Sequence, residues 1–166
     1  IFMVGDEKLY KVLKELGIEF EYYEHPAAPT IEEAMKHWKY VEATHCKNLF
    51  FRNHKGDKHY LVILEAAKQM NIHDIEKRLK QGKLSFASEK RMLKYLGLKP
   101  GSVSPFGLLH DEDDKVVVFL DENLQKAEKL SFHPNLNTAS LVITYPNLVK
   151  FLNWTGNEYH FLKLYD

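Results

Sequence analysis

The sequence lacks the features that define several large classes of protein. Its 166 residues include one cysteine, Cys46, so no disulfide can form within the chain, and a reducing compartment such as the cytosol is expected. No apolar run approaches the roughly 20 residues that span a bilayer, and the N-terminal segment is too short and wrongly flanked for a signal peptide. We therefore predict a cytoplasmic protein without a membrane partner.

The signatures of several common active sites are also missing. The chain has no G-x-S-x-G elbow, no P-loop, no Rossmann glycine pattern and no H-E-x-x-H motif. Its nine histidines are scattered and show no zinc-ligand spacing, so neither a metal nor a cofactor is expected. The formal net charge is zero, which argues against a wide duplex-binding surface but permits a small patch that grips the end of one RNA strand.

Length and patterning favour one domain over residues 1–166, of mixed α/β (α+β) class. Helical spacing and capping residues predict helices at 6–16, 30–38, 71–82, 88–97 and from Pro146 onward, the second with a Thr30–Glu33 capping box. Alternating or continuous apolar runs predict strands at 18–22, 116–120, 129–132, 139–144 and 158–165, with a hairpin at 47–65. Together these elements predict a mostly antiparallel sheet with helices packed on it.

The stretch from His45 to Arg52 is the most informative part of the chain. Leu49, Phe50 and Phe51 form an apolar strand, and Lys47 and Asn48 stand at its start. An ammonium group held at the start of a rigid strand can grip a phosphate or polarise an ester, although most lysines at such positions are simply solvated. We expect Lys47 to position the substrate rather than act as a base, because a lysine base needs strong burial. Asn48 either binds the ligand or caps the strand.

The adjacent thiol of Cys46 is the most obvious nucleophile in the sequence. Neighbouring side chains of an extended segment point to opposite faces, so His45 is poorly placed to act as its base. We therefore expect Cys46 to pack as a small apolar side chain.

A loop rich in glycine, proline and serine supplies a second group of candidates. Gly101 allows close approach of the backbone to a ligand, and Pro105 stiffens the loop. Backbone N–H groups of such a loop can stabilise a developing oxyanion. Ser102 and Ser104 have no visible partner base, so hydrogen bonding within the loop is their expected role. Phe106 and Gly107 are expected at the floor of the pocket.

The turn that begins at His133 supplies a third group. Small polar residues crowd this turn between two strands, and Asn137 and Thr138 among them are candidates for ligand contact. A weaker candidate is His25, which precedes Pro26 and is as consistent with a turn as with a binding role.

These segments, taken in order, resemble the YbaK/ProX family of aminoacyl-tRNA deacylases, and most closely its PrdX and ProXp-ala branch of free-standing alanyl-tRNA(Pro) deacylases. The resemblance extends from about Tyr10 to about Leu164. It rests on residues 24–26 with 30–34, 45–51, 84–87, 99–108 and 132–140. It implies that Lys47 is the essential lysine, that residues 101–105 form the family's G-x-x-x-P loop, and that His133 lines the aminoacyl pocket. It also implies the layered α/β fold of the family and a chemistry that uses no thiol.

The expected activity is therefore hydrolysis, in trans, of a mischarged aminoacyl-tRNA, with alanine on tRNA(Pro) as the leading substrate. The partners implied are the acceptor end of tRNA(Pro) and prolyl-tRNA synthetase. Pocket size would be set around Phe50, Gly101, Phe106 and His133. Lysines and arginines at 8, 11, 14, 80, 83, 90 and 91 are candidates for RNA contact or simply solvated helix faces. Two alternatives stay open, a deacylase for serine, threonine or cysteine, and a non-catalytic binder of tRNA ends or amino acids.

Overall fold

The computed structural model describes residues 2–28, 31–39 and 41–166. Its helices are α1 (Glu7–Glu15), α2 (Ile31–Trp38), α3 (Ile72–Leu79), α4 (Glu89–Leu96) and α5 (Tyr145–Thr155), with 3-10 helices η1 (Pro105–His110) and η2 (Glu122–Lys126). Its strands are β1 (Glu21–Glu24), β2 (Thr44–Asn53), β3 (His59–Glu65), β4 (Leu84–Phe86), β5 (Val116–Asp121), β6 (Lys129–Phe132), β7 (Ala139–Thr144) and β8 (Tyr159–Leu162). None of the helices described has the length and apolar character needed to cross a bilayer.

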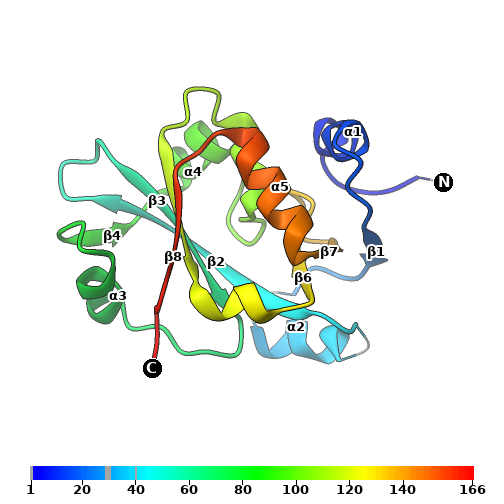
Figure 1. Ribbon diagram of the computed structural model, residues 1–166, viewed down its shortest axis with the longest axis horizontal. Coiled ribbons are helices and arrows are strands. Elements are labelled where there is room, and N and C mark those ends of the chain that lie inside the picture. The colour runs from blue at the N-terminus through cyan, green and yellow to red at the C-terminus, as the bar shows by residue number, and fades with distance from the viewer. Residues whose placement is uncertain (1, 29–30, 40) are drawn as a thin grey trace.

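All eight described strands join in one mixed sheet, in which β2 is the central branching strand (Figure 1). The order is β1-β7-β6-β2-β3-β5-β8, and β4 pairs with β2 outside this path. Four of the seven pairings are antiparallel, and the β2–β6, β3–β5 and β5–β8 pairings are parallel. The predicted mixed, mostly antiparallel sheet with packed helices is confirmed.

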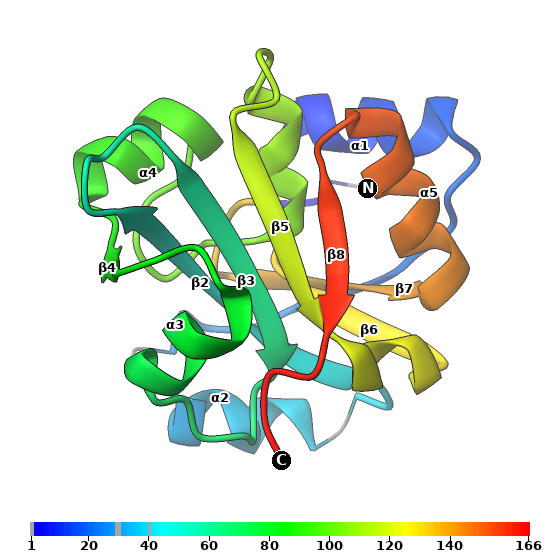
Figure 2. The same cartoon turned by 60° about the vertical axis from the view of Figure 1, so that its left-hand side comes forward.

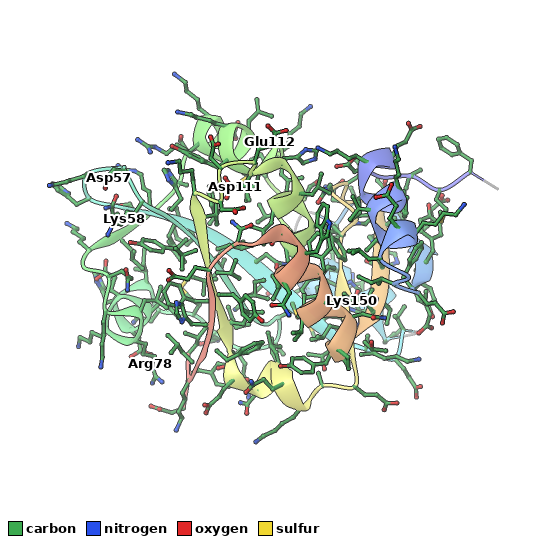
Figure 3. The ribbon with its side chains drawn as sticks, turned by 45° about the horizontal axis from the view of Figure 1, so that its top comes forward. Asp57, Lys58, Arg78, Asp111, Glu112 and Lys150 are labelled. Atoms are coloured by element: carbon green, nitrogen blue, oxygen red, sulfur yellow. The ribbon has the colours of Figure 1, made fainter. Side chains whose placement is uncertain are left out.

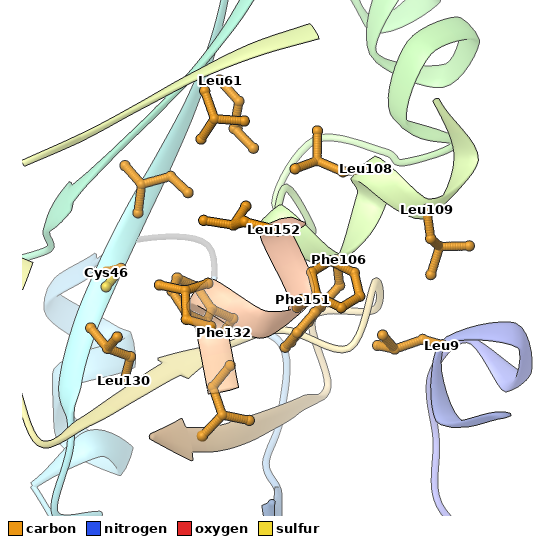
Figure 4. Close-up of a cluster of buried hydrophobic side chains, with 14 of the residues drawn as sticks. Leu9, Cys46, Leu61, Phe106, Leu108, Leu109, Leu130, Phe132, Phe151 and Leu152 are labelled. Carbon is orange, nitrogen blue, oxygen red and sulfur yellow. The ribbon is translucent and has the colours of Figure 1, made fainter. Parts of the chain in front are cut away.

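Helices cover both faces of the sheet and divide the buried apolar residues into two clusters. The larger cluster joins α1, α4, α5 and η1 to one face, and includes the edge-to-face contacts of Phe106 with Phe132 and Phe151 (Figure 4). The smaller cluster packs Ile75 and Leu79 of α3 against the other face. Figure 2 shows α1 and α5 together at one side of the molecule and α3 at the opposite side.

Capping residues mark the helix starts as the sequence predicts. Asp6, Asn71 and Ser88 each accept a hydrogen bond from a backbone N–H in the first turn of α1, α3 and α4. Pro146 lies in the first turn of α5, where its missing N–H costs no hydrogen bond. The Thr30 half of the expected capping box of α2 lies outside the described residues.

Three local features differ from the sequence-based expectations. The first strand begins at Glu21 rather than near Ile18, because pairing with β7 covers only Glu21–Glu24, although Ile18 is buried. The three-residue strand β4 was not expected, and it pairs with Phe51–Asn53 of β2. The predicted loop at 99–109 contains the 3-10 helix η1, which the Ser104 hydroxyl caps and Pro105 begins.

Candidate functional site

The site lies where β2 and β6 separate. These two parallel strands pair only at Thr44 with Leu130 and at His45 with Ser131. The next strand on that edge of β2 is β4, whose register with β2 begins at Phe51. Lys47 lies two residues beyond His45, and His133 lies two residues beyond Ser131. The twofold alternation of strands therefore places both side chains on the same face of the sheet, on either side of this opening.

The ammonium group of Lys47 is held in place rather than extended into solvent. Its Nζ donates a hydrogen bond to the backbone carbonyl of Lys68, in the turn that follows β3. The side chain is half-buried, and burial lowers the pKa of the lysine below its ordinary value. The turn and strand β2 thus fix a cation beside the opening.

His133 is held as a neutral imidazole whose Nε2 is the acceptor nitrogen. Its Nδ1 lies 2.7 Å from the carbonyl oxygen of Ala139, which can only accept, so the proton resides on Nδ1. Burial lowers the pKa of this histidine, with the hydrogen bond to Ala139 acting in the opposite direction. Nε2 is consequently an acceptor at neutral pH, able to bind a hydroxyl or water hydrogen.

A second histidine, His25, lies next to His133. The rings of His25 and His133 lie 5.8 Å apart between centroids. Nε2 of His25 accepts from the hydroxyl of Ser140 at 2.8 Å, and the backbone N–H of His25 bonds the carbonyl of Thr138 at 3.0 Å. Thr138 thus serves the site through its main chain, by tying the His133 turn to the end of β1.

A small cavity connects the two histidines to α2. It has a volume of about 20 Å³ and is lined by His25, Ala28, Ala34, His37, Trp38, His133 and Asn137. A cavity of this size has room for one water molecule beside polar partners. A larger cavity of about 290 Å³ adjoins it, since His25, His37 and Trp38 line both. The arrangement suits a small substrate group with one water next to an imidazole.

The Gly101 loop meets the His133 turn through Asn137. Gly101 has a φ of +85°, and a Cβ built on it would lie 3.4 Å from Nδ2 of Asn137. Ser104 is fully buried and its hydroxyl accepts from the N–H of Phe106, so it acts as a helix cap. Ser102 is also buried. The structure therefore brings Gly101, Asn137 and His133 together from two separate loops.

The apolar candidates lie in the core instead. Phe50 packs against His59 with ring centroids 5.7 Å apart, and Phe106 packs between Phe132 and Phe151. A Cβ on Gly107 would lie 2.6 Å from Cδ1 of Leu98, so this glycine permits close packing of η1. None of these three residues is among the lining of the cavities beside α2. Pro105 is likewise buried at the start of η1.

Two polar groups on β2 have no hydrogen-bond partner within the described part of the chain. Oδ1 of Asn48 is buried and unpaired one residue from Lys47, and Nδ1 of His45 is buried and unpaired two residues from it. Cys46, between them, packs in the larger core cluster as the sequence predicts, and burial raises the pKa of its thiol. The alternation of the strand turns Asn48 and His45 to opposite faces of the sheet, so the two unpaired atoms do not form one binding site.

Sequence reasoning missed the contribution of α2. The indole of Trp38 stacks on His45 with ring centroids 4.5 Å apart and planes within 2°. Trp38 and His45 also line a third cavity of about 390 Å³, next to the turn at Glu65–Ala67. No local pattern in the sequence pairs Trp38 with His45, because the stack joins a helix to a separate strand. Although His25, His37, His45 and His133 line these adjoining cavities, the residues described include no group of His, Cys, Asp or Glu side chains arranged to hold a metal ion.

Comparison with known proteins identifies the family of the chain. A family model described as the aminoacyl-tRNA editing domain matches residues 25–151. The chain is 39% identical to the prolyl-tRNA editing protein ProX of Acetoanaerobium sticklandii, over 92% of this chain and 93% of that protein. It is 34% identical to the mouse prolyl-tRNA synthetase associated domain-containing protein 1, over 94% of this chain and 96% of the relative.

A solved structure of a proposed trans-editing enzyme for prolyl-tRNA synthetase shares the fold. It superposes with a TM-score of 0.70 at 22% identity, over 96% of this chain and 99% of the other. The resemblance inferred from the motifs is confirmed. The chain belongs to the aminoacyl-tRNA editing domain family.

Proposed function

We propose that this editing domain hydrolyses the ester bond of misacylated tRNA in trans, with alanine on tRNA(Pro) as its leading substrate. The observation that carries the proposal is that Lys47 and His133 each lie two residues beyond the last pair of β2 and β6 and on the same face of the sheet. His133 also lines a cavity with room for one water. Family membership and the names of the relatives, which refer to prolyl-tRNA, support the same reading.

Hydrolysis of an aminoacyl ester requires few catalytic groups from the protein. An aminoacyl ester is already activated, so the enzyme has to orient one water and stabilise the charge that develops on the carbonyl oxygen. Water oxygen bonds to the carbonyl carbon, the bond from that carbon to the 3′-oxygen of the terminal ribose breaks, and the proton from water ends on the departing oxygen. The products are the free amino acid and uncharged tRNA.

Each site residue has a defined part in this sequence. The ammonium of Lys47 binds the terminal ribose-phosphate or the ester carbonyl, and backbone N–H groups of the Gly101 loop stabilise the oxyanion. Nε2 of His133 accepts a hydrogen bond from the attacking water or from the 2′-hydroxyl of the terminal adenosine. The 2′-hydroxyl can help to activate the water, which explains a site without a strong protein base.

Selection by size accounts for the substrate. A synthetase pocket rejects a smaller apolar amino acid by only about 1–3 kcal/mol, so a second site must remove the error. That site must admit the methyl group of alanine and reject the larger pyrrolidine ring of proline, and the small cavity at His133 is the candidate for it. The acceptor end of tRNA(Pro) is the partner this requires, and prolyl-tRNA synthetase is the enzyme whose errors would be corrected.

A deacylation panel tests the proposal. Purified protein is incubated with Ala-tRNA(Pro), Pro-tRNA(Pro), Ser-tRNA, Thr-tRNA and Cys-tRNA, and the remaining ester is measured over time. Rapid loss of Ala-tRNA(Pro) with Pro-tRNA(Pro) intact is the expected result. Cleavage of Ser-, Thr- or Cys-tRNA without Ala-tRNA(Pro) would assign a different substrate. Tight binding of all of them without turnover would identify a non-catalytic binder.

A further inference from the structure

Charge is unevenly distributed along this chain, although the formal net charge is zero. Residues 77–99 contain eight lysines and arginines and one acidic residue, Glu89. The rest of the chain carries 15 lysines and arginines against 22 acidic residues. A concentration of one sign in a neutral protein is an electrostatic footprint for a partner of the opposite sign.

This basic segment surrounds β4, the short strand that pairs with the end of β2. It runs from the end of α3 through β4 and α4 to the loop that precedes Gly101. Figures 1 and 2 both show α3, β4 and α4 on the side of the molecule away from α1. Figure 3 shows Lys58, at the tip of the β2–β3 hairpin, on the same side as Arg78 of α3, and far from Lys150 of α5.

Two of the eight cations have structural partners. Arg78 contacts Asp74 and Asp166 and donates to the carbonyl of Lys163, which ties α3 to the end of the chain. Arg91 donates to the carbonyl of Gly56 at 2.8 Å and so fastens the hairpin tip to α4. These two arginines organise the surface rather than present charge to a ligand.

The other six are exposed lysines, which we call the basic edge. None of them forms a salt bridge with the residues that the structure describes. Its members are Lys77, Lys80, Lys83, Lys90, Lys94 and Lys99. The ammonium of Lys94 also lies over the ring of Tyr95, 5.3 Å from its centroid. Surface ammonium groups without a carboxylate partner remain available to phosphate.

The distance from the basic edge to the site suits a tRNA acceptor end. Phe86 of β4 lies opposite Phe51, four residues along β2 from Lys47, or about 13 Å at 3.3 Å per residue. Unpaired nucleotides separate the esterified adenosine from the first base pair of the acceptor stem. A duplex beside β4 and α4 could therefore deliver its 3′ end to the opening between β2 and β6.

We propose that the basic edge binds the phosphate backbone of the acceptor stem, as the docking surface for double-stranded RNA next to the editing site. This inference rests on the proposed function for the identity of the RNA. The lysines neutralise backbone phosphates and read no sequence, so they contribute affinity for any acceptor stem. The cavities beside α2, and not these lysines, would select the amino acid.

The test compares two triple variants that remove equal charge. K83Q/K90Q/K94Q alters the basic edge, and K8Q/K11Q/K14Q alters three exposed lysines of α1, on the other side of the molecule. Binding of uncharged tRNA(Pro) is measured by fluorescence anisotropy at several salt concentrations. Deacylation is measured on Ala-tRNA(Pro) and on alanine esterified to a short CCA oligonucleotide that lacks a duplex.

The basic-edge variant is expected to bind tRNA at least about tenfold more weakly, and the slope of log K against log salt is expected to fall by about 2–3. KM for Ala-tRNA(Pro) rises in parallel, whereas cleavage of the short oligonucleotide is unchanged. The α1 variant resembles the wild type in every measurement.

Equal effects of the two triple variants would overturn the docking surface while leaving the proposed function intact. Loss of cleavage of the short oligonucleotide in the basic-edge variant would also overturn it, since the lysines would then act on the site itself. Loss of binding to prolyl-tRNA synthetase, with tRNA affinity unchanged, would instead assign the surface to a protein partner. Wild-type binding that depends on the basic edge, with neither substrate cleaved, would support the docking surface and refute the proposed deacylase.

Discussion

Lys47 and His133 occupy equivalent positions on two parallel strands, each two residues beyond the last backbone pair, His45 with Ser131. If the ladder continued, the two residues would lie side by side. The strands separate instead, so a lysine held by the Lys68 carbonyl and an imidazole held by the Ala139 carbonyl flank an opening in the sheet. The fold thus provides a cation and a hydrogen-bond acceptor at fixed positions.

This relationship predicts that the two side chains act on one substrate. We expect Lys47→Ala and His133→Ala each to lower kcat/KM for Ala-tRNA(Pro) by about 100-fold or more, the loss typical of one stabilising group in an ester-cleaving site. The double variant is expected to lose less than the product of the two single losses, because groups that act as a unit are not additive. Single-turnover deacylation of all four proteins measures the coupling.

Thermal unfolding of the same four proteins is the control. Lys47→Ala should melt close to the wild type, since Lys47 is only half-buried, whereas His133→Ala should melt at a lower temperature because the Ala139 carbonyl loses its donor. Fully multiplicative losses would show that the two residues act independently. A Lys47→Ala variant with the activity of the wild type would remove the lysine from the site.

Gly82 is a control for Gly101, because the two glycines have nearly the same backbone conformation. Comparing them separates the loss of stability caused by backbone strain from a loss of activity. Gly101 and Gly82 have φ values of +85° and +83°. A Cβ on Gly101 would lie 3.4 Å from Nδ2 of Asn137, whereas a Cβ on Gly82 would have no atom within 4 Å. Alanine at either position should cost about 1 kcal/mol of stability through backbone strain.

The two substitutions should differ in activity. Gly101→Ala is expected to reduce kcat/KM by about 10- to 100-fold, because its methyl group would contact the amide of Asn137 where the two loops of the site meet. Gly82→Ala should leave activity unchanged. Urea unfolding and deacylation assays on both variants test the pair, and similar activity in the two would indicate that the Gly101 loop plays no part in catalysis.

Many of the helices and strands could be predicted, because their capping residues and their pattern of apolar residues indicate the same elements. Residues close in sequence determine several elements: the caps at Asn71 and Ser88, the apolar strand β5 and the hairpin around Gly56. The placement of His133 and Gly101 near one another could not be obtained that way. Their proximity depends on Asn137, which contacts the other loop only once the sheet has formed.

The features that sequence reasoning missed depend on contacts between distant segments. Strand β4 has three residues, too few for a periodic pattern, and forms because β2 offers a free edge at Phe51–Asn53. Phe106 reads as a pocket residue from its Gly- and Pro-rich surroundings, yet η1 turns its ring toward Phe132 and Phe151. The stack of Trp38 on His45 joins α2 to β2 and has no local signature.

Asp6 is predicted to stabilise both the fold and the His133 turn. Its carboxylate accepts from Nε2 of His110 at 2.6 Å, from Nδ2 of Asn135 at 3.0 Å and from the backbone N–H of Lys8. Burial acts to raise the pKa of Asp6, but these hydrogen bonds and the charge of His110 lower it on balance. Asp6→Ala should cost about 2–4 kcal/mol, from a lost helix cap and unpaired partners.

Asp6→Asn keeps a good capping residue and removes the charge, so a loss of about half that size is expected, measured by urea denaturation. Asp74→Ala is the matched control, because its contact with Arg78 is a surface pair and should cost less than about 1 kcal/mol. Deacylation by Asp6→Ala is expected to fall as the Asn135 contact is lost. Equal stability of Asp6→Ala and Asp74→Ala would contradict this assignment.

His59 is expected to make stability depend on pH. It is buried beneath Tyr95, and Nη1 of Arg91 donates to its Nε2 at 2.9 Å. Burial, followed by the positive charge of Arg91, lowers the pKa of His59 to about 4 from 6.5. Because the unfolded chain binds this proton more readily, the stabilisation is complete above pH 6.5 and is lost as the pH falls toward 4.

Between pH 7.5 and pH 5 we expect the wild type to lose on the order of 1–2 kcal/mol of unfolding free energy through this residue. His59→Gln offers an uncharged acceptor to Arg91 and does not titrate, so its stability should fall less over the same range. Urea denaturation of both proteins at several pH values measures the difference. The range stops at pH 5 so that protonation of carboxylates such as Asp6, whose pKa is low, contributes little. Parallel stability curves for the two proteins would show that His59 does not take up the proton on unfolding.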